Sequence, residues 1–210
     1  MANLITIGRL LLLFVTIALI YSRSYSVVAW CTLLVGIVFA SDALDGFVAR
    51  RRQSTSDLGA VIDIAGDRVV ENALWVVFAQ LGLIGVWAPL LVLTRGFFVD
   101  AMRGMTYSVG KTAFGEKTMM RTPVTQFIAA SRFMRAFYGL AKALGFVFLT
   151  SLFAAHLSAG SSLDRFYAHD SVRYFGWAMV YSALALTVIR GVPVLIDAMY
   201  YVREPKRTPS

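Results

Sequence analysis

Long apolar stretches, separated by short polar connections, are the feature that most constrains the fold of this chain. Each stretch is close to or longer than the roughly 20 mostly apolar residues that a helix needs to cross a lipid bilayer. The sequence therefore predicts an all-α integral membrane protein with six transmembrane helices, forming one domain over residues 1–210. The stretches cover approximately residues 4–21, 27–50, 58–82, 87–105, 124–157 (or 132–157) and 172–201.

The composition agrees with an apolar environment. Hydrophobic residues make up 58% of the chain and charged residues only 15%, and the mean hydropathy is +0.68. A soluble domain has about half apolar residues and about a quarter charged ones. The excess apolar surface therefore indicates lipid rather than water as the surrounding solvent.

The positions of the basic residues predict the orientation in the membrane. The net charge is +8, and the basic side chains gather in residues 50–52, 103–121 and 203–207. With six spans these segments lie on the same side as both termini, and Lys and Arg are enriched in cytoplasmic loops. We therefore expect cytoplasmic N and C termini, and we interpret the charge as a signal for orientation rather than for nucleic-acid binding.

Four acidic residues lie at the junction of the second and third stretches. Asp42 and Asp45 have i, i+3 spacing and Asp63 and Asp67 have i, i+4 spacing, so each pair projects from one helical face. The short connection between the stretches turns these faces toward one another. Four converging carboxylates repel one another unless cations lie among them. Ligands that are all oxygen favour hard ions, so we expect one or two Mg²⁺ or Mn²⁺ ions.

The small and basic residues between the acids suggest a ligand. Gly46 and Ala49 leave a groove beside the helix, and Arg50 offers a guanidinium fork that suits phosphate oxygens. Metal ions, an arginine and a groove together are typical of a diphosphate site. A single Asp could be a helix cap and a single Gly could serve packing, but these explanations do not account for the whole set.

The complete stretch forms one ungapped pattern, Asp42-x2-Asp45-Gly46-x2-Ala49-Arg50-x8-Gly59-x3-Asp63-x3-Asp67. This pattern resembles the signature of the CDP-alcohol phosphotransferase family. The resemblance implies that the four aspartates bind metal and that Asp67 is the general base for the acceptor hydroxyl. It also implies a CDP site, lined by Asp45, Gly46, Ala49, Arg50 and Gly59.

The resemblance carries further expectations about the whole protein. Members of the family are membrane enzymes of six transmembrane helices and are usually homodimers. They transfer a substituted phosphate group from a CDP-alcohol, such as CDP-diacylglycerol, to a second alcohol and release CMP. We therefore expect a lipid donor, surrounding membrane lipids, a homodimer, and a site facing the cytoplasm from the inner membrane of a bacterium or archaeon.

The acceptor alcohol is predicted from basic residues in the fourth and fifth stretches. They are Arg95, Arg103, Arg132, Arg135 and Lys142. Arg95 and Arg103 lie about 80° apart on a helix, and charged groups at such depth usually face a cavity or a partner. The group suits a phosphorylated acceptor. The alternative is that Arg95 or Arg103 pairs with Asp100, and that the remaining arginines mark the inner leaflet.

Two short segments resemble the phosphatidylglycerophosphate synthase branch of the family. They are TRGFFVDAMRG and YGLAKAL, and in that branch two arginines and a lysine hold glycerol 3-phosphate. Here Arg95 and Arg103 are each followed by Gly, where Glu is common in the branch. Glycerol 3-phosphate is therefore the expected acceptor, and inositol phosphate, serine or another small alcohol stay open.

Two other classes of protein fit the sequence less well. An intramembrane prenyltransferase would carry a second Asp-rich motif and more spans than this sequence has. A transporter or channel would explain buried charge in six helices, but not the spacing of Gly, Ala and Arg between the acids.

The first stretch carries a smaller polar pattern. Asn3, Thr6 and Arg9 follow one another at intervals of three residues, which places them on roughly one helical face. Either Arg9 reaches the membrane interface from the start of a helix, or it lies at the edge of the acidic site. The sequence leaves both interpretations open.

Overall fold

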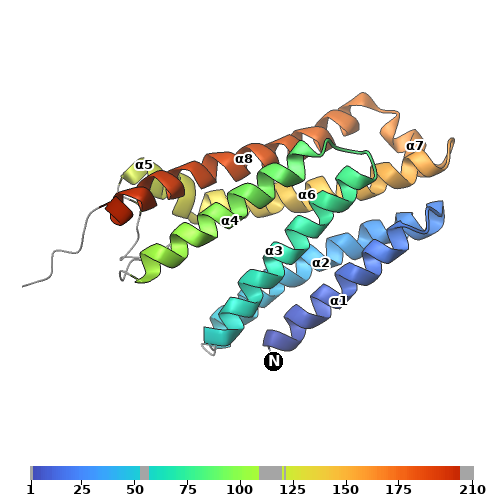
Figure 1. Ribbon diagram of the computed structural model, residues 1–210. Helices are drawn as coiled ribbons and strands as arrows, with labels where there is room; N and C mark the ends of the chain where they lie inside the picture. Colours follow the sequence, from blue (N-terminus) through green and yellow to red (C-terminus); the bar gives the residue numbers. More distant parts are fainter. Residues whose placement is uncertain (1, 53–56, 109–119, 121, 204–210) are drawn as a thin grey trace, which may run out of the picture. The chain divides into compact units, whose positions relative to one another are not determined.

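The computed structural model describes residues 2–52, 57–108, 120 and 122–203, and all of the secondary structure assigned within them is helical (Figure 1). Inside these ranges the side chains of residues 42–52, and those at several helix ends, are not described. The helices are α1 (Ala2–Ile20), α2 (Tyr25–Arg52), α3 (Asp57–Gln80), α4 (Trp87–Ser108), α5 (Pro123–Ala130), α6 (Arg132–Leu157), α7 (Ser162–Tyr167) and α8 (Asp170–Arg203).

The long helices confirm the all-α prediction. α1, α2, α3, α4, α6 and α8 begin and end within a few residues of the expected stretches. The helical conformation is interrupted between α5 and α6 at Ser131, whose backbone is extended. A helix therefore begins at Arg132, one of the two starting points expected for the fifth stretch, while the apolar segment that includes α5 begins at Pro123, next to the other.

The connection between the last two apolar stretches contains a helix. Residues 158–171 lie between the stretches expected at 124–157 and 172–201, and α7 forms in their middle. Its N-cap is Ser161, whose hydroxyl accepts a hydrogen bond from the Asp164 backbone N–H at 3.1 Å. A Ser N-cap satisfies one of the free donors of a first turn and so supports the start of this six-residue helix.

The described residues include two helical segments that are long and apolar enough to cross a membrane. They are Pro123–Leu157 and Asp170–Met199. Two shorter apolar helices cover Thr6–Ile20 and Tyr25–Ser41. Charged residues in α3 and α4 shorten their apolar windows, so six crossings stay a prediction.

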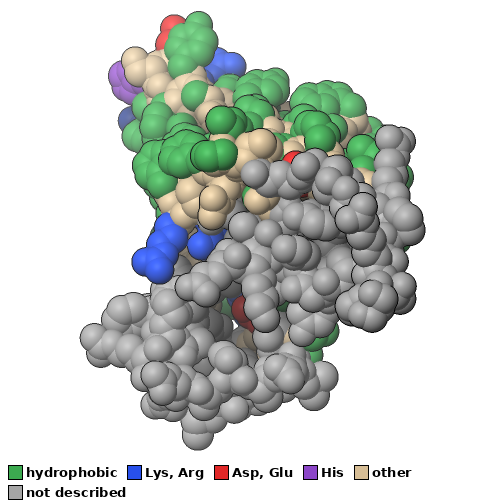
Figure 2. Space-filling model, turned by 90° about the vertical axis from the view of Figure 1, so that its left-hand side faces the viewer, with side chains coloured by type: hydrophobic (Ala, Val, Ile, Leu, Met, Phe, Trp, Pro, Cys, Tyr) green, Lys and Arg blue, Asp and Glu red, His purple; other side chains and the backbone are tan. Residues whose placement is uncertain are grey.

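Large apolar side chains lie on the outside of the described structure. Figure 2 shows hydrophobic side chains over much of the described surface that is visible in this view. Trp30 of α2 is 68% exposed and Leu11 of α1 is 62% exposed. Apolar faces of this kind need an apolar partner or solvent, which agrees with a membrane protein.

Packing contacts group the chain into two compact units. The first contains Met1–Pro89 and Lys142–Val180, and the second contains Leu90–Ala141 and Tyr181–Ser210. Both α6 and α8 contribute residues to each unit. One domain over the whole chain stays a prediction.

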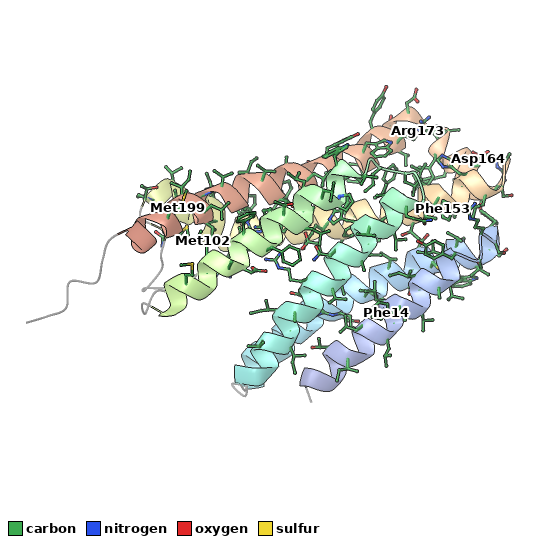
Figure 3. The ribbon with its side chains drawn as sticks, viewed as in Figure 1. Phe14, Met102, Phe153, Asp164, Arg173 and Met199 are labelled. Carbon is green, nitrogen blue, oxygen red and sulfur yellow. The ribbon has the colours of Figure 1, made fainter. Side chains whose placement is uncertain are left out.

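The first unit holds the second half of the acidic motif. In it α1 packs against both α2 and α3. Ile20, Cys31 and Phe153 (Figure 3) belong to one buried cluster. The Phe146 ring contacts Trp75 edge-on, with 4.8 Å between the ring centroids. These contacts fix α3 between α1 and α6, the two helices whose side chains reach its acids.

Candidate functional site

Three acidic residues follow one another along α3 at intervals of four. They are Asp63, Asp67 and Glu71, and this spacing places them on neighbouring turns of one helical side. The side chains of Asp63 and Asp67 are each 48% exposed, whereas that of Glu71 is only 4% exposed. The first two are therefore accessible to a ligand, and the third is enclosed by protein.

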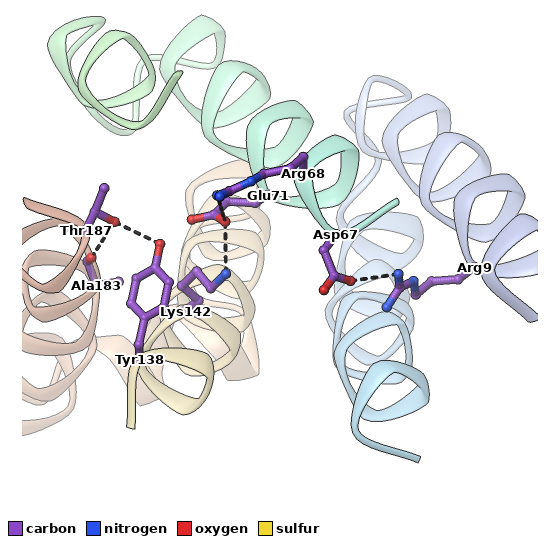
Figure 4. A network of polar contacts seen from close by, with 8 residues as sticks. All are labelled: Arg9, Asp67, Arg68, Glu71, Tyr138, Lys142, Ala183 and Thr187. Atoms are coloured by element: carbon purple, nitrogen blue, oxygen red, sulfur yellow. Dashed lines mark hydrogen bonds and ion pairs between the residues drawn. The ribbon is translucent and has the colours of Figure 1, made fainter. Parts of the chain in front are cut away.

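Arg9 of α1 binds the two accessible acids. Its Nη2 donates a hydrogen bond to Asp67 Oδ1 at 2.8 Å (Figure 4). The same Nη2 lies 3.6 Å from Asp63 Oδ1. The Arg9 side chain is 2% exposed, so it does not extend outward to an interface. Of the two interpretations that the sequence left open, the structure supports a position at the edge of the acidic site.

A glycine allows α1 to come this close to α3. A Cβ atom on Gly66 would lie 2.7 Å from Thr6 Cγ2 and 3.2 Å from Arg9 Nη2. The first distance is shorter than real Cβ contacts, so a side chain at this position would force α1 to shift. Gly66 immediately precedes Asp67, and the close approach therefore occurs where the ion pair forms.

The buried acid of α3 pairs with α6. Lys142 Nζ donates a hydrogen bond to Glu71 Oε2 at 3.0 Å, and Arg68 Nη1 lies 3.8 Å from the same oxygen (Figure 4). The Lys142 side chain is 16% exposed. A buried carboxylate is stable only with such compensation. The lysine predicted to bind the acceptor thus has a carboxylate partner, which the sequence analysis missed because Glu71 lies outside the motif.

The predicted cations of the second unit have different surroundings. The Arg95 side chain lies against Gly191 of α8, where a Cβ atom would be 2.8 Å from Arg95 Cγ. Arg103 Nη1 is 3.9 Å from Asp100 Oδ1, as the alternative of a local pair expected. Arg132 and Arg135 are exposed at the start of α6. Acceptor binding by these residues stays a prediction.

Arg190 of α8 is a buried cation that the sequence analysis did not single out. It is 7% exposed, its Nη2 donates to the Ala129 carbonyl oxygen at 3.2 Å, and its guanidinium lies 5.1 Å from the centroid of the Tyr138 ring. Tyr138 in turn shares a 2.9 Å hydrogen bond with Thr187 (Figure 4). A charged residue inside a long apolar stretch was the signal that could have identified Arg190.

The first half of the motif lies on α2, where the side chains are not described. This applies to Asp42, Asp45, Ala49 and Arg50, and to Gly46 between them. Among the described side chains no three of His, Cys, Asp or Glu gather closely enough to hold a metal ion. Asp63 and Asp67 nevertheless fit a hard divalent ion, because they offer accessible carboxylate oxygens from one side of a helix.

Comparison with known proteins identifies the family. Residues 1–189 match the family model described as CDP-alcohol phosphatidyltransferase. The chain belongs to this family, and the resemblance seen in the acidic motif is confirmed.

Individual relatives match over shorter segments. A Mycobacterium tuberculosis protein named as a phosphatidylglycerophosphate synthase is 29% identical over 108 residues, covering 49% of this chain and 51% of that protein. A Pseudomonas fluorescens protein named "CDP-diacylglycerol--glycerol-3-phosphate 3-phosphatidyltransferase" is 33% identical over 119 residues, covering 54% and 59%. A Mycobacterium bovis protein named as a cardiolipin synthase is 28% identical over 111 residues, covering 53% and 52%. The chain spans about half the length of the curated relatives it matches.

The Glu71–Lys142 pair generates a prediction about stability. Lys142→Met removes the nearer of the two cations beside the buried Glu71 carboxylate and leaves Arg68 at 3.8 Å. Losing one partner of a buried pair costs about 3–5 kcal/mol of unfolding free energy, and with Arg68 in place we expect a loss at the lower end of this range. Glu71→Gln/Lys142→Met leaves no uncompensated carboxylate and is expected to be more stable than Lys142→Met alone. Thermal unfolding in detergent measures both.

Arg132→Met provides the matched control, because Arg132 is an exposed cation on the same helix. We expect its midpoint to stay close to that of the wild type. Equal loss in the single and double variants would show that the pair is not the source of the effect.

Proposed function

We propose that this protein is an integral membrane enzyme that transfers a phosphatidyl group from CDP-diacylglycerol, or a closely similar lipid donor, to glycerol 3-phosphate and releases CMP. The observation that carries the proposal is the family match over residues 1–189, which includes the whole acidic motif. The names of the relatives in M. tuberculosis and P. fluorescens support the choice of acceptor. The product would be phosphatidylglycerophosphate.

The reaction assigned to this site forms one bond and breaks one. The acceptor hydroxyl oxygen attacks the phosphorus that carries the diacylglycerol group, and the bond from this phosphorus to the bridging diphosphate oxygen breaks. CMP leaves with the electron pair of that bond. Asp67 takes the proton of the hydroxyl, and the transfer accompanies the attack because a carboxylate beside cations is a weak base in isolation.

The residues of the motif would also bind the metal ions and the CDP group of the donor. Asp42, Asp45, Asp63 and Asp67 would hold one or two Mg²⁺ or Mn²⁺ ions. When bound, such ions neutralise charge on the diphosphate and orient the reacting oxygens. Arg50 would bind phosphate oxygens, and Asp45, Gly46, Ala49 and Gly59 would line the CDP site.

A phosphorylated acceptor is supported by the cations of α4 and α6. Guanidinium groups form oriented, paired hydrogen bonds with phosphate, and Arg95, Arg103, Arg132 and Arg135 supply four of them. Lys142 adds an ammonium group that is fixed by Glu71. Inositol phosphate has the same anionic group and is the first alternative, before serine and other small alcohols.

The proposal includes the placement of the chain in the membrane. Six crossings would put both termini and the acidic motif on the cytoplasmic side of a bacterial or archaeal inner membrane, and the protein would act as a homodimer. The distribution of Lys and Arg supports this orientation. The exposed apolar side chains of α1 and α2 support a lipid surrounding.

The first prediction of this function concerns Asp67 and the metal ions. Asp67→Asn removes the general base and should lower kcat by about 10²–10⁴-fold, measured as CMP release from CDP-diacylglycerol. Chelation with EDTA should abolish turnover of the wild type, and added Mg²⁺ or Mn²⁺ should restore it. Asp164→Asn, in α7, is the control and should retain wild-type turnover. Normal turnover of Asp67→Asn would contradict the assignment.

The second prediction concerns the acceptor. Purified protein with CDP-diacylglycerol and a divalent ion is offered glycerol 3-phosphate, inositol phosphate, serine or phosphatidylglycerol in separate reactions. We expect CMP release to be fastest with glycerol 3-phosphate, because the basic residues favour a phosphorylated alcohol and the P. fluorescens relative is named for this acceptor. CMP release with only a non-phosphorylated acceptor would overturn this part of the proposal.

The third prediction concerns topology. The single cysteine, Cys31, is buried, so Cys31→Ser gives a background for single cysteines elsewhere. Ala159→Cys, at an exposed position between α6 and α7, should react with an impermeant thiol reagent added outside intact cells. Ser210→Cys should react only after the cells are opened. The reverse pattern would show that the termini face outward.

A further inference from the structure

We propose that Arg9 is a positioning residue for the reaction: it holds one oxygen of Asp67 and so fixes the orientation of this carboxylate, and Gly66 sets the approach of α1 that brings Arg9 there. This inference rests on the proposed function. It adds a residue from outside the acidic motif, on a different helix, to the machinery of the site.

The side-chain exposures of Arg9 and Asp67 indicate that Arg9 positions Asp67 and not the reverse. Arg9 has a side chain that is 2% exposed, whereas Asp67 and Asp63 are each 48% exposed. A buried side chain in a packed interior has few accessible rotamers, so the guanidinium is the fixed partner. Its Nη2 is 2.8 Å from Asp67 Oδ1, a good charge-assisted hydrogen bond. One oxygen of Asp67 is thereby held in place.

The same contact offsets the repulsion between the acids. Asp63 and Asp67 are neighbours on α3, and Arg9 Nη2 is within 3.6 Å of an oxygen on each. The positive charge of Arg9 attracts both side chains and so opposes their mutual repulsion. The acids therefore keep one arrangement instead of separating, which is the kind of preorganisation that a catalytic site requires.

Gly66 gives an independent indication that this position of α1 matters. A Cβ atom here would be 2.7 Å from Thr6 Cγ2, and Thr6 is 3% exposed, so its methyl group has little room to move. By contrast, a Cβ atom on Gly8, next to Arg9, would meet nothing within 4 Å among the described residues. Close packing thus requires glycine at position 66 on α3, beside Asp67. It does not require glycine at position 8 on α1, beside Arg9.

A positioning role and a purely structural role predict different results for metal affinity. If Arg9 only supported the fold, its loss would weaken the whole site, and metal binding and turnover would fall together. If Arg9 orients Asp67, its loss reduces turnover. Metal affinity is retained or increases, because a positive charge beside the carboxylates has been removed.

The first experiment compares Arg9→Gln and Arg9→Lys with the wild type, as full-length protein in detergent. Turnover is followed by CMP release, and the Kd for Mn²⁺ is measured from the electron paramagnetic resonance signal of the free ion. For Arg9→Gln we expect kcat to fall by about 10–100-fold, the size of effect that follows a small misplacement of a catalytic group. The Kd for Mn²⁺ should not rise by more than about threefold, and Arg9→Lys should recover part of kcat.

The second experiment acts on the same contact without changing charge. Gly66→Ala is expected to lower kcat in the same way as Arg9→Gln. Thr6→Ser/Gly66→Ala should recover much of the loss, because Ser lacks the methyl group that the new Cβ would meet and keeps the hydroxyl. Combining Gly66→Ala with Arg9→Gln should give little further loss, since changes that act through one contact are not additive. Gly8→Ala is the matched control and should behave as the wild type.

The outcomes separate this proposal from the function on which it rests. If the wild type releases no CMP with any acceptor, the proposed function fails and this inference fails with it. If the wild type is active, a kcat for Arg9→Gln within threefold of it overturns this inference alone. A Kd for Mn²⁺ that rises in step with the loss of kcat also overturns it, and so does a Gly66→Ala defect that Thr6→Ser does not relieve. Should Arg9→Gln fail to fold, Arg9→Lys and the Gly66 pair provide the test.

Discussion

The compensation of negative charge on α3 is the interaction on which the described site depends. Asp63, Asp67 and Glu71 lie along one side of a helix in a chain that is mostly apolar. An uncompensated carboxylate in such surroundings is strongly unfavourable. Each of the three has a cation within 3.6 Å, supplied by α1 for the first two and by α6 for the third. Charge pairing therefore adds to the packing contacts that hold α1 and α6 beside α3.

The two kinds of pair serve different purposes, and exposure distinguishes them. The Glu71–Lys142 pair is enclosed, with side chains 4% and 16% exposed, and a pair of this kind restricts how α3 and α6 can pack. In the Arg9 pair the cation is enclosed while the acids are 48% exposed. This arrangement holds the acids through a buried guanidinium while their own side chains stay partly exposed. One helix thus carries an enclosed contact and a partly exposed acidic surface within about two turns.

The sequence predicted the elements well and their side-chain partners poorly, for physical reasons. Helix ends follow from apolar stretches and polar connections, and the shared face of Asp63 and Asp67 follows from their spacing. The partner of Asp67 is 58 residues away, and no local pattern reports such a contact. Glu71 and Arg190 were overlooked because each is a charge within an apolar stretch that forms no motif with other residues at a fixed spacing. α7 was overlooked because a six-residue helix depends on its Ser161 cap rather than on periodicity.

The pairing of basic residues with acidic ones also affects how an anionic acceptor would be recognised. Lys142 already shares its charge with Glu71, and Arg103 lies 3.9 Å from Asp100, so counting basic residues overstates the positive potential. Selectivity for a phosphorylated alcohol would then come less from net charge than from oriented guanidinium donors. Arg95 suits such a role in one respect, since its side chain lies against Gly191 of α8, where a Cβ atom would be 2.8 Å from Arg95 Cγ. A guanidinium held in one orientation by packing favours anions whose oxygens match its fork of donors.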